Sequence, residues 1–260
     1  MNILEKIIER KRIEVEQAKT EISLAELQAK PFFVRTCHSL RDSILDSSKN
    51  GIISEYKRAS PSKGIINDHS GPAEVAKAYE ENNVSAISVL TDHDFFKGSL
   101  DDLVSVRNAV NIPVLRKEFI IDPFQITEAK AYGADIILLI AACLSSDEIK
   151  QFSAHAKEIG LNVLLEVHNE KELKNNIFDT IDAIGVNNRN LMDFSVSIQH
   201  SIDLVNLIPD QFIKVSESGI SDPETIKQLK DVGFQAFLIG ENFMKTPNPA
   251  EAIQEFVKHI

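Results

Sequence analysis

The sequence has little cysteine, no excess of basic charge and no long apolar run, and each shortage excludes a class of protein. Its two cysteines, Cys37 and Cys143, lie far apart, so they form neither a disulfide framework nor a CxxC metal pair. Such sparing use of cysteine is typical of a reducing compartment, and we expect a cytoplasmic protein. The net charge of −11 disfavours nucleic acid and anionic membranes as partners, although a local cluster of Lys and Arg can still bind an anionic substrate.

Membrane segments and cofactor motifs are also missing. The N-terminal stretch MNILEKIIERKRIEVEQAK is charged throughout and has no apolar core of signal-peptide length. The longest apolar run, ADIILLIAACL, is too short to span a bilayer. No strand is followed by GxGxxG or GxxxxGKS/T, and no histidine pair has metal-ligand spacing on a helix. We therefore predict no metal site, no cofactor, and no nucleic-acid or membrane partner.

From residue 51 onward, short apolar runs alternate with amphipathic segments. The runs are rich in Val, Ile and Leu, as in strands buried on both faces, and they are GIISEY, SAISVLTD, IPVLRKEF, ADIILLIAA, LNVLLEVH, DAIGVNN, QFIKVSESG and QAFLIGENF. Helical patterns lie between them, among them SVSIQHSIDLVNLI over 195–208, and several have a Ser, Asp or Asn cap followed by Pro. Eight such units predict a single α/β domain, a (β/α)8 TIM barrel; a doubly wound open sheet is the alternative.

The first fifty residues precede these units. LEKIIERKRIEVEQAK carries apolar residues at Leu4, Ile7, Ile8 and Val15, roughly one face of a helix. LAEL and SLRDSIL indicate two further short helices, and no Gly/Ser/Pro-rich linker follows them. We expect residues 1–50 to form an N-terminal helical extension packed on the barrel, and residues 51–260 to form the catalytic (β/α)8 domain.

Polar side chains gather where the strands end, which is where barrels of this type place their active sites. Residues two apart on a strand point to the same face, so parity sorts these side chains. Arg116 and Glu118 have the parity that faces the helices, and Phe119 has the opposite one. The side chains from five strands that are predicted to face the barrel interior are Glu55, Lys57, Lys117, Glu166, Asn187, Arg189 and Glu217.

These side chains predict proton-transfer chemistry on a phosphorylated substrate. Acids and bases mixed in a partly dry cavity suit general acid and base catalysis, although each alone could be a structural ion pair. Gly219 and Gly240, in the loops SESGIS and IGEN after the last two strands, could let backbone N–H groups approach a phosphate; ordinary turn glycines are the alternative. His168 could face the mouth, and Cys143 is predicted to be a small apolar residue.

Six motifs carry a resemblance that covers nearly the whole chain. They are EYKRASPSKG, LRKEFIIDPFQITEA, LLEVHNEKEL, IGVNNRNL, VSESGI and FLIGENFM, in this order and each at a strand end. Together they resemble indole-3-glycerol phosphate synthase of tryptophan biosynthesis, and the N-terminal helix is similar to that family's extra helix. The resemblance implies a lyase without a cofactor that converts 1-(2-carboxyphenylamino)-1-deoxyribulose 5-phosphate to indole-3-glycerol phosphate, carbon dioxide and water.

The resemblance also implies roles for individual residues. Lys117 is the acid for ring closure, Glu166 is a base or proton relay that shares this work with Glu55, and Lys57 is the acid for dehydration or a phosphate contact. The orienting residues of the catalytic set are Asn187, Glu217 and Ser218. The residues expected to bind substrate are Ser60 and Arg189 at its carboxylate, Gly219, Gly240 and Glu241 at its phosphate, and Phe119.

Departures from the family pattern are small, and two alternatives stay open. Asn242 and Phe243 stand where small or aliphatic residues are commoner, but neither is a proposed catalytic residue. One alternative is another phosphosugar barrel enzyme, such as a Schiff-base aldolase that uses Lys57 or Lys117. The other is a phosphosugar-binding module without catalytic activity. In each case we expect a monomer that binds a phosphorylated small molecule.

Overall fold

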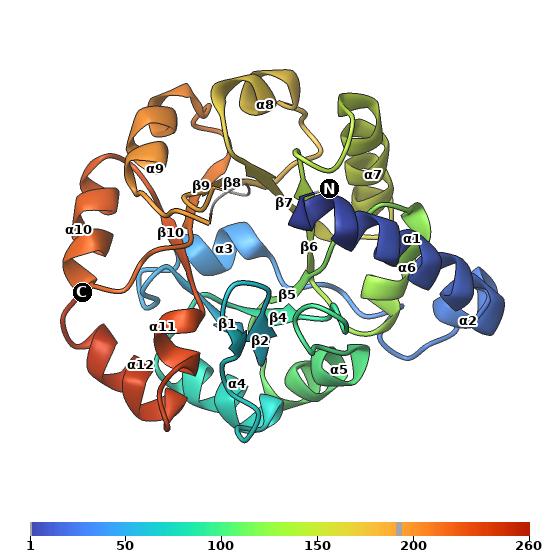
Figure 1. The fold of residues 1–260 in the computed structure, drawn as a ribbon, viewed down its shortest axis with the longest axis horizontal. Helices are drawn as coiled ribbons and strands as arrows, with labels where there is room; N and C mark the ends of the chain where they lie inside the picture. The colour runs from blue at the N-terminus through green and yellow to red at the C-terminus, as the bar shows by residue number, and fades with distance from the viewer. Residues whose placement is uncertain (1, 191–193) are drawn as a thin grey trace.

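A computed structural model describes residues 2–190 and 194–260 of the chain (Figure 1). Eight parallel strands close into one barrel in the order β1-β10-β9-β8-β7-β6-β5-β4, which confirms the predicted TIM barrel and excludes the open sheet. The barrel strands are β1 (Ile52–Tyr56), β4 (Ala86–Leu90), β5 (Val114–Lys117), β6 (Ile136–Ile140), β7 (Asn162–Val167), β8 (Ala183–Asn187), β9 (Ile213–Glu217) and β10 (Ala236–Ile239).

Helices surround the barrel and alternate with its strands (Figure 1). Several begin at the caps that the sequence indicates: Asp122 and Asp222 each accept a hydrogen bond from the first turn of a helix with Pro at its start. None of the helices in the described ranges has the length and apolar character needed to cross a membrane. The surrounding helices are α4 (Pro72–Glu81), α5 (Leu100–Ala109), α6 (Pro123–Ala131), α7 (Ser146–Glu158), α8 (Glu170–Asn175), α9 (Gln199–Leu204), η1 (Val205–Leu207), α10 (Pro223–Asp231), α11 (Glu241–Met244) and α12 (Pro249–Val257).

Strand parity separates two apolar clusters. Ile53, Leu115, Leu164 and Val215 lie inside the barrel, whereas residues of the other parity, such as Ile52, pack between the sheet and the helices. The inward rows are mostly apolar along the strands and carry charged side chains at their carboxyl ends, so the barrel is packed toward the amino ends and polar at the carboxyl ends.

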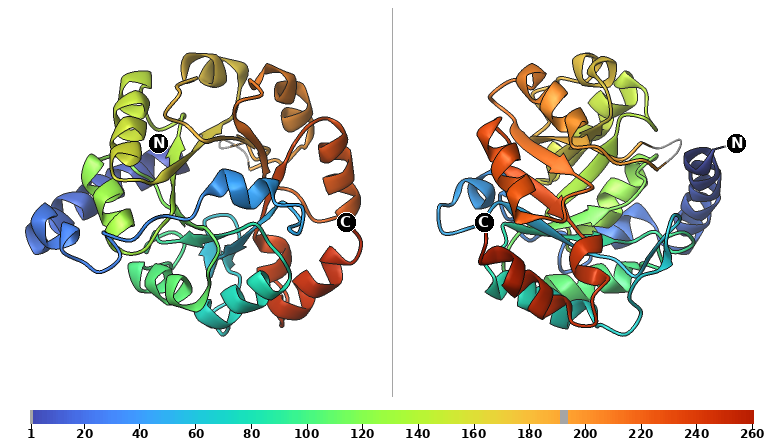
Figure 2. Two further views of the ribbon diagram at one scale, coloured as in Figure 1. Left: turned by 180° about the vertical axis from the view of Figure 1, so that it is seen from behind. Right: turned by 60° about the vertical axis from the view of Figure 1, so that its left-hand side comes forward.

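The N-terminal helices reach both ends of the barrel. The helix α1 (Ile3–Glu21) crosses in front of the strands in Figure 1, and α2 (Leu24–Gln28) packs on α6 through Leu27. The helix α3 (Leu40–Leu45) lies behind the barrel and faces the viewer in Figure 2, left. Leu40 and Ile44 of α3 join the interior cluster, so α3 closes the barrel at the amino ends of its strands.

Two local features differ from the prediction. The helix predicted over 195–208 begins only at Gln199, because Val196 forms an antiparallel bridge with Arg189 instead. A small antiparallel pair, β2 (Ala59–Ser60) and β3 (Gly64–Ile65), follows β1 and was not predicted. Leu191, which ends the motif IGVNNRNL, lies outside the described residues. Both features lie in loops at the carboxyl ends of the strands.

Candidate active site

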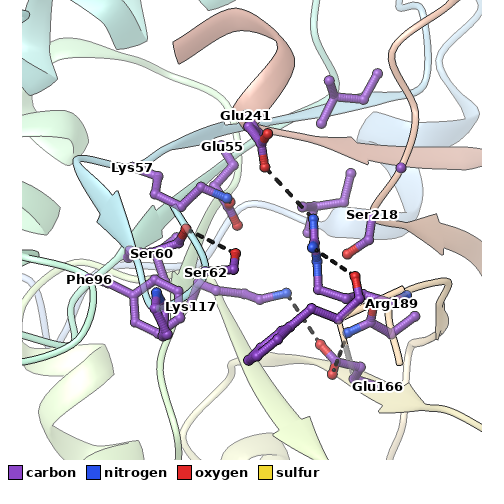
Figure 3. Close-up of a pocket in the computed structure, with 18 of the residues that line it drawn as sticks. Glu55, Lys57, Ser60, Ser62, Phe96, Lys117, Glu166, Arg189, Ser218 and Glu241 are labelled. Atoms are coloured by element: carbon purple, nitrogen blue, oxygen red, sulfur yellow. Dashed lines mark hydrogen bonds and ion pairs between the residues drawn. The ribbon is translucent and has the colours of Figure 1, made fainter. Parts of the chain in front are cut away.

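A cavity of about 410 Å³ opens at the carboxyl ends of the strands (Figure 3). Loops after β1, β4, β5, β8, β9 and β10 line it together with Glu166 of β7, and the first turns of α1 contribute Ile3, Leu4 and Ile7. The candidate site residues on its wall are Glu55, Lys57, Ser60, Lys117, Phe119, Glu166, Asn187, Arg189, Ser218, Gly219, Gly240 and Glu241. One predicted member of the set, Glu217, does not reach the wall.

Lys117 lies at the centre of the site. Its Nζ is 3.3 Å from Oε2 of Glu166 (Figure 3) and 2.8 Å from Oε2 of Glu217, so a single ammonium group is shared by two carboxylates. Burial by itself lowers the pKa of Lys117, but the charges of Glu217, Glu166 and Glu55 outweigh it and raise the pKa above its ordinary value. Lys117 is therefore an ammonium ion at neutral pH and can donate a proton into the cavity.

Glu217 lies beneath Lys117 rather than on the cavity wall. Its side chain is 1% exposed, and its Oε1 is buried without a hydrogen-bond partner in the described part of the chain. A Cβ atom at Gly185 of the neighbouring strand would lie 2.0 Å from that oxygen, so the carboxylate fits only because residue 185 has no side chain. Burial and the negative charges of Glu166 and Glu55 outweigh Lys117 and raise the pKa of Glu217 to about 7.

Glu166 differs from Glu217 in its environment. Burial alone raises its pKa, but the charges of Lys117 and His168 and a 3.0 Å hydrogen bond from Asn187 Nδ2 hold the pKa below its ordinary value. Glu166 is thus ionised at neutral pH, when Glu217 is partly protonated. Two carboxylates on one lysine therefore hold their protons with different strength, as a pair divided between base and acid requires.

A second acid–base pair lies at the carboxyl end of β1. Lys57 Nζ is 2.8 Å from Oε1 of Glu55, and Ser88 Oγ approaches Oε2 of Glu55 at 3.4 Å. A Cβ atom at Gly240 would lie 2.6 Å from Oε1 of Glu55. Gly240 therefore makes room for a carboxylate, and its φ of −126° requires no glycine.

Groups that can bind anions lie on both sides of the cavity. Arg189 Nη2 lies 3.7 Å from Oε2 of Glu241 at the start of α11 (Figure 3). Ser218 and Gly219 follow β9 with φ values of 69° and 76°, an unusual conformation for Ser218. Ser60 on β2 faces Ser62 with 3.5 Å between their hydroxyl oxygens. These groups can donate hydrogen bonds to carboxylate or phosphate oxygens.

Arg116 and Glu118 point away from the barrel interior, as their parity predicts. Arg116 Nη2 is 2.7 Å from Oε2 of Glu128 on α6. Glu118 accepts a 2.7 Å hydrogen bond from Thr91 and pairs at 3.0 Å with Lys11 of α1. These residues tie the N-terminal helix and α6 to the sheet.

The sequence analysis missed most of the apolar wall. Phe96, in the loop after β4, lies 6.1 Å from Phe119 between ring centroids, and both line the cavity (Figure 3). The run HDFF directly after a predicted strand is a signal that could have identified Phe96. Leu4 and Ile7 belong to the apolar face predicted for the first helix, and Ile3 precedes it, but nothing in the sequence shows that these residues cover the cavity.

The described cysteine and histidine side chains near the cavity are arranged neither as a metal site nor as a catalytic nucleophile with its base. Within residues 2–190 and 194–260, no three or more His, Cys, Asp and Glu side chains are grouped so that they could hold a metal ion. Cys143 is partly buried against the interior cluster, and burial raises the pKa of its thiol to about 12. His168 faces Glu166 from a neighbouring hollow rather than the cavity.

Comparisons with known proteins identify the family. A family model described as indole-3-glycerol phosphate synthase matches residues 4–256. Curated proteins with that name are 47% identical in Bacteroides thetaiotaomicron, over 100% of this chain and 99% of the relative, and 41% identical in Aliarcobacter butzleri, over 98% of both. Solved structures share the fold at low identity: a Pyrococcus furiosus tryptophan synthase complex chain has a TM-score of 0.61 at 17% identity, covering 81% of this chain and 98% of that chain. The chain belongs to the indole-3-glycerol phosphate synthase family.

Proposed function

We propose that the cavity carries out the indole-3-glycerol phosphate synthase reaction with Lys117 as the first proton donor. One observation carries the proposal: the Lys117 ammonium lies among carboxylates on the wall of a partly apolar cavity. The reaction converts 1-(2-carboxyphenylamino)-1-deoxyribulose 5-phosphate to indole-3-glycerol phosphate, carbon dioxide and water, and the family is a group of carboxy-lyases of tryptophan biosynthesis.

Ring closure requires a proton on the carbonyl oxygen. The ring carbon that bears the carboxylate attacks the carbonyl carbon, and the electron pair of the C=O bond moves to oxygen. Lys117 donates its proton there, and its charge stabilises the oxygen as the bond forms. Glu166 and Glu217 hold the Lys117 ammonium in place, because both lie within ion-pair distance of its Nζ.

Decarboxylation and dehydration follow. Loss of carbon dioxide returns the electron pair to the ring, and the new hydroxyl must then leave as water. Lys57 protonates the leaving hydroxyl, and Glu166, with Glu55, accepts the proton that the ring system releases. The 2.8 Å pair of Lys57 with Glu55 and the low pKa of Glu166 support these roles.

The remaining groups bind and orient substrate. Arg189 and Ser60 meet its carboxylate, Phe119 packs on its apolar part, and Asn187 and Ser218 orient its hydroxyl groups. The phosphate lies at the loops after β9 and β10, where Gly219, Gly240 and the backbone of Glu241 line the cavity. These placements rest on the lining of one common cavity and on the chemistry of each group.

A turnover assay tests the proposal. Mixing the protein with the carboxyphenylamino-deoxyribulose phosphate should produce the fluorescence of an indole, and the product should lack one carboxyl group. Borohydride added during turnover should trap no covalent adduct, because a lysine held protonated between two carboxylates is a poor Schiff-base nucleophile. A borohydride-trapped adduct at Lys57 or Lys117, without indole formation, would support the aldolase alternative instead.

We further propose that residues 1–50 act as an extension that covers the barrel of residues 51–260 at both ends, in a monomeric, cytoplasmic protein that binds neither nucleic acid nor membranes. Support comes from Ile3, Leu4 and Ile7 at the cavity, from Leu40 and Ile44 at the floor, and from the net charge of −11. Light scattering after gel filtration should give the mass of one chain, and a dimer mass would contradict the proposal.

A further inference from the structure

His168 lies between two carboxylates on the side of Glu166 that faces away from Lys117. It follows β7 directly, its Nε2 is 3.4 Å from Oε1 of Glu166, and its Nδ1 is 3.4 Å from Oε2 of Glu172 on α8. The backbone N–H of His168 also donates to Oε2 of Glu172 at 2.8 Å. The imidazole is thus enclosed by acid at both ends.

The surroundings of the two ring nitrogens favour the protonated form of His168. Both are buried, and neither makes a hydrogen bond with the described residues, so each faces its carboxylate at ion-pair distance. A neutral imidazole carries a lone pair on one nitrogen, which would then face a carboxylate oxygen. Only the imidazolium, with a proton on each nitrogen, is attracted to both carboxylates.

Glu166 is therefore held by cations on two sides. Its Oε2 faces Lys117 and its Oε1 faces His168, while Asn187 Nδ2 donates to the same Oε1 at 3.0 Å. Lys117, Glu166, His168 and Glu172 thus form a row of alternating charge. The row leads from the cavity wall to a separate hollow of about 320 Å³ lined by His168 and Glu172.

Burial and the surrounding carboxylates act on the protonation of His168 in opposite directions. Burial by itself lowers the pKa of His168, but Glu172, Glu166 and Glu217 outweigh it and raise the pKa above its ordinary value. Lys117 faces Glu166 from the opposite side, while Arg189, His200 and Cys143 are the other ionisable groups close by. At neutral pH the carboxylates therefore favour a charged His168.

We propose that His168 is a positioning residue whose positive charge keeps Glu166 ionised and oriented toward the reacting atoms. The inference rests on the proposed role of Glu166 as a base. Without the imidazolium, Glu166 loses one of its two cations and the attraction that fixes its Oε1. A charge at this distance lowers a carboxylate pKa by about 1 unit or more, so its loss lets Glu166 take up a proton at higher pH.

The decisive measurement is the pH profile of kcat for His168→Gln, in which the amide can still donate a hydrogen bond but has no charge. The acid limb of the profile should move up by about 1 pH unit, so that kcat falls about tenfold on the acid side and much less on the alkaline side. His200→Gln is the matched control, because His200 lines the same hollow and has no ion pair in the described ranges; its profile should coincide with that of the original protein.

Glu172→Gln separates charge from packing. With one carboxylate gone, the pKa of His168 should fall, which NMR of the ring nitrogens measures, while the acid limb of the kcat profile stays in place because His168 still carries its charge there. Should His168→Gln fail to fold, NMR of ¹⁵N-labelled histidine rings in the original protein and in Glu172→Gln still decides. A His168 ring that is neutral at pH 6, or an unmoved acid limb in folded His168→Gln, overturns the proposal. A wild-type protein that forms no indole product would instead refute the proposed function.

Discussion

The barrel has a buried cluster of ion pairs at each end, and the two clusters differ in how completely their carboxylates are paired. At the floor, the Asp135 carboxylate accepts hydrogen bonds from the side chains of Arg107 and Arg35, at 2.7 and 2.8 Å, and from the backbone N–H groups of His38 and Val114. At the mouth, Glu166 and Glu217 share Lys117, and Oε1 of Glu217 has no hydrogen-bond partner in the described residues.

The difference lies in how completely each charge is satisfied. In the floor cluster two arginines pair with one carboxylate, and these contacts hold the N-terminal segment to β5 and β6. The mouth cluster has more acid than base beside an open chamber, so its protons can move. Incomplete pairing next to a cavity, rather than burial, therefore distinguishes the proposed catalytic cluster at the mouth from the ion cluster at the floor.

Lys117→Ala should produce the largest effect at the mouth. A general acid acts on charge that develops as the carbonyl is attacked, so kcat should fall by about 10²–10⁴-fold with a smaller change in substrate binding. Arg116→Ala is the control, since Arg116 pairs with Glu128 outside the barrel and should reduce stability more than turnover. Circular dichroism must show both variants folded. If Lys117→Ala keeps near-normal turnover and Arg116→Ala loses activity, then Arg116 rather than Lys117 faces the cavity and the proposed acid is wrong.

Asp135→Ala should produce the opposite pattern at the floor. It leaves Arg107 buried without its carboxylate, which typically costs about 3–5 kcal/mol of unfolding free energy. The kcat of the molecules that remain folded should change by less than about twofold, because Asp135 touches no cavity residue. Urea unfolding and active-site titration measure the two quantities. An equal loss of stability from Lys117→Ala would show that both clusters are structural.

Glu217→Gln should change the pH dependence of stability. In the folded protein the pKa of Glu217 is about 7, above the 4.5 of an unperturbed glutamate, so the unfolded chain releases this proton at lower pH. The free energy of unfolding therefore falls as pH rises through that interval. Glutamine removes this contribution, so the variant should lose less stability than the original protein between about pH 5 and 8, by on the order of 1–3 kcal/mol. Parallel stability curves would contradict the raised pKa.

The smallest expected effect is on KM, which should respond to inorganic phosphate and to a substitution at the mouth but not to one at the floor. Phosphate should raise the apparent KM for substrate at constant ionic strength and leave kcat unchanged, because it occupies the site of the substrate phosphate. If Lys57 contacts that phosphate, Lys57→Ala should raise KM on the order of tenfold. Arg35→Ala removes a cation at the floor and is the control, with KM unchanged. If added phosphate leaves KM unchanged, the assignment of the phosphate site is wrong.

The fold and the polar residues of the site could be predicted from the sequence, because both depend on patterns within single segments of the chain. Eight apolar runs with caps between them define the barrel, and strand parity alone places Glu55, Lys117 and Glu166 on one face. The burial of Glu217 below the cavity wall could not be predicted in this way. It depends on the missing side chain of Gly185 in another strand, and a relation between strands cannot be read from either segment.

The apolar wall of the cavity escaped prediction for a physical reason. Ile3, Leu4 and Ile7 form an ordinary apolar helix face, and apolar side chains look the same in sequence whether they cover a helix or a substrate. The helix predicted over 195–208 was wrong in its first turn. Pairing of Val196 with Arg189 across the loop outweighs the local helical pattern there.

The closure of the floor by α3 has a consequence for the order in which the molecule can assemble during its synthesis. Arg41 donates to the carbonyl of Gln211, 170 residues later in the chain, and the backbone of Leu40 donates to Asn162, 122 residues later. The hydrogen bond of Ser43 to the carbonyl of Ser85 can form early, but the contacts of Leu40 and Arg41 must wait until Asn162 and Gln211 have been made. Until then Leu40 and Ile44 are apolar side chains without a core, and only completion of the last strands gives them one.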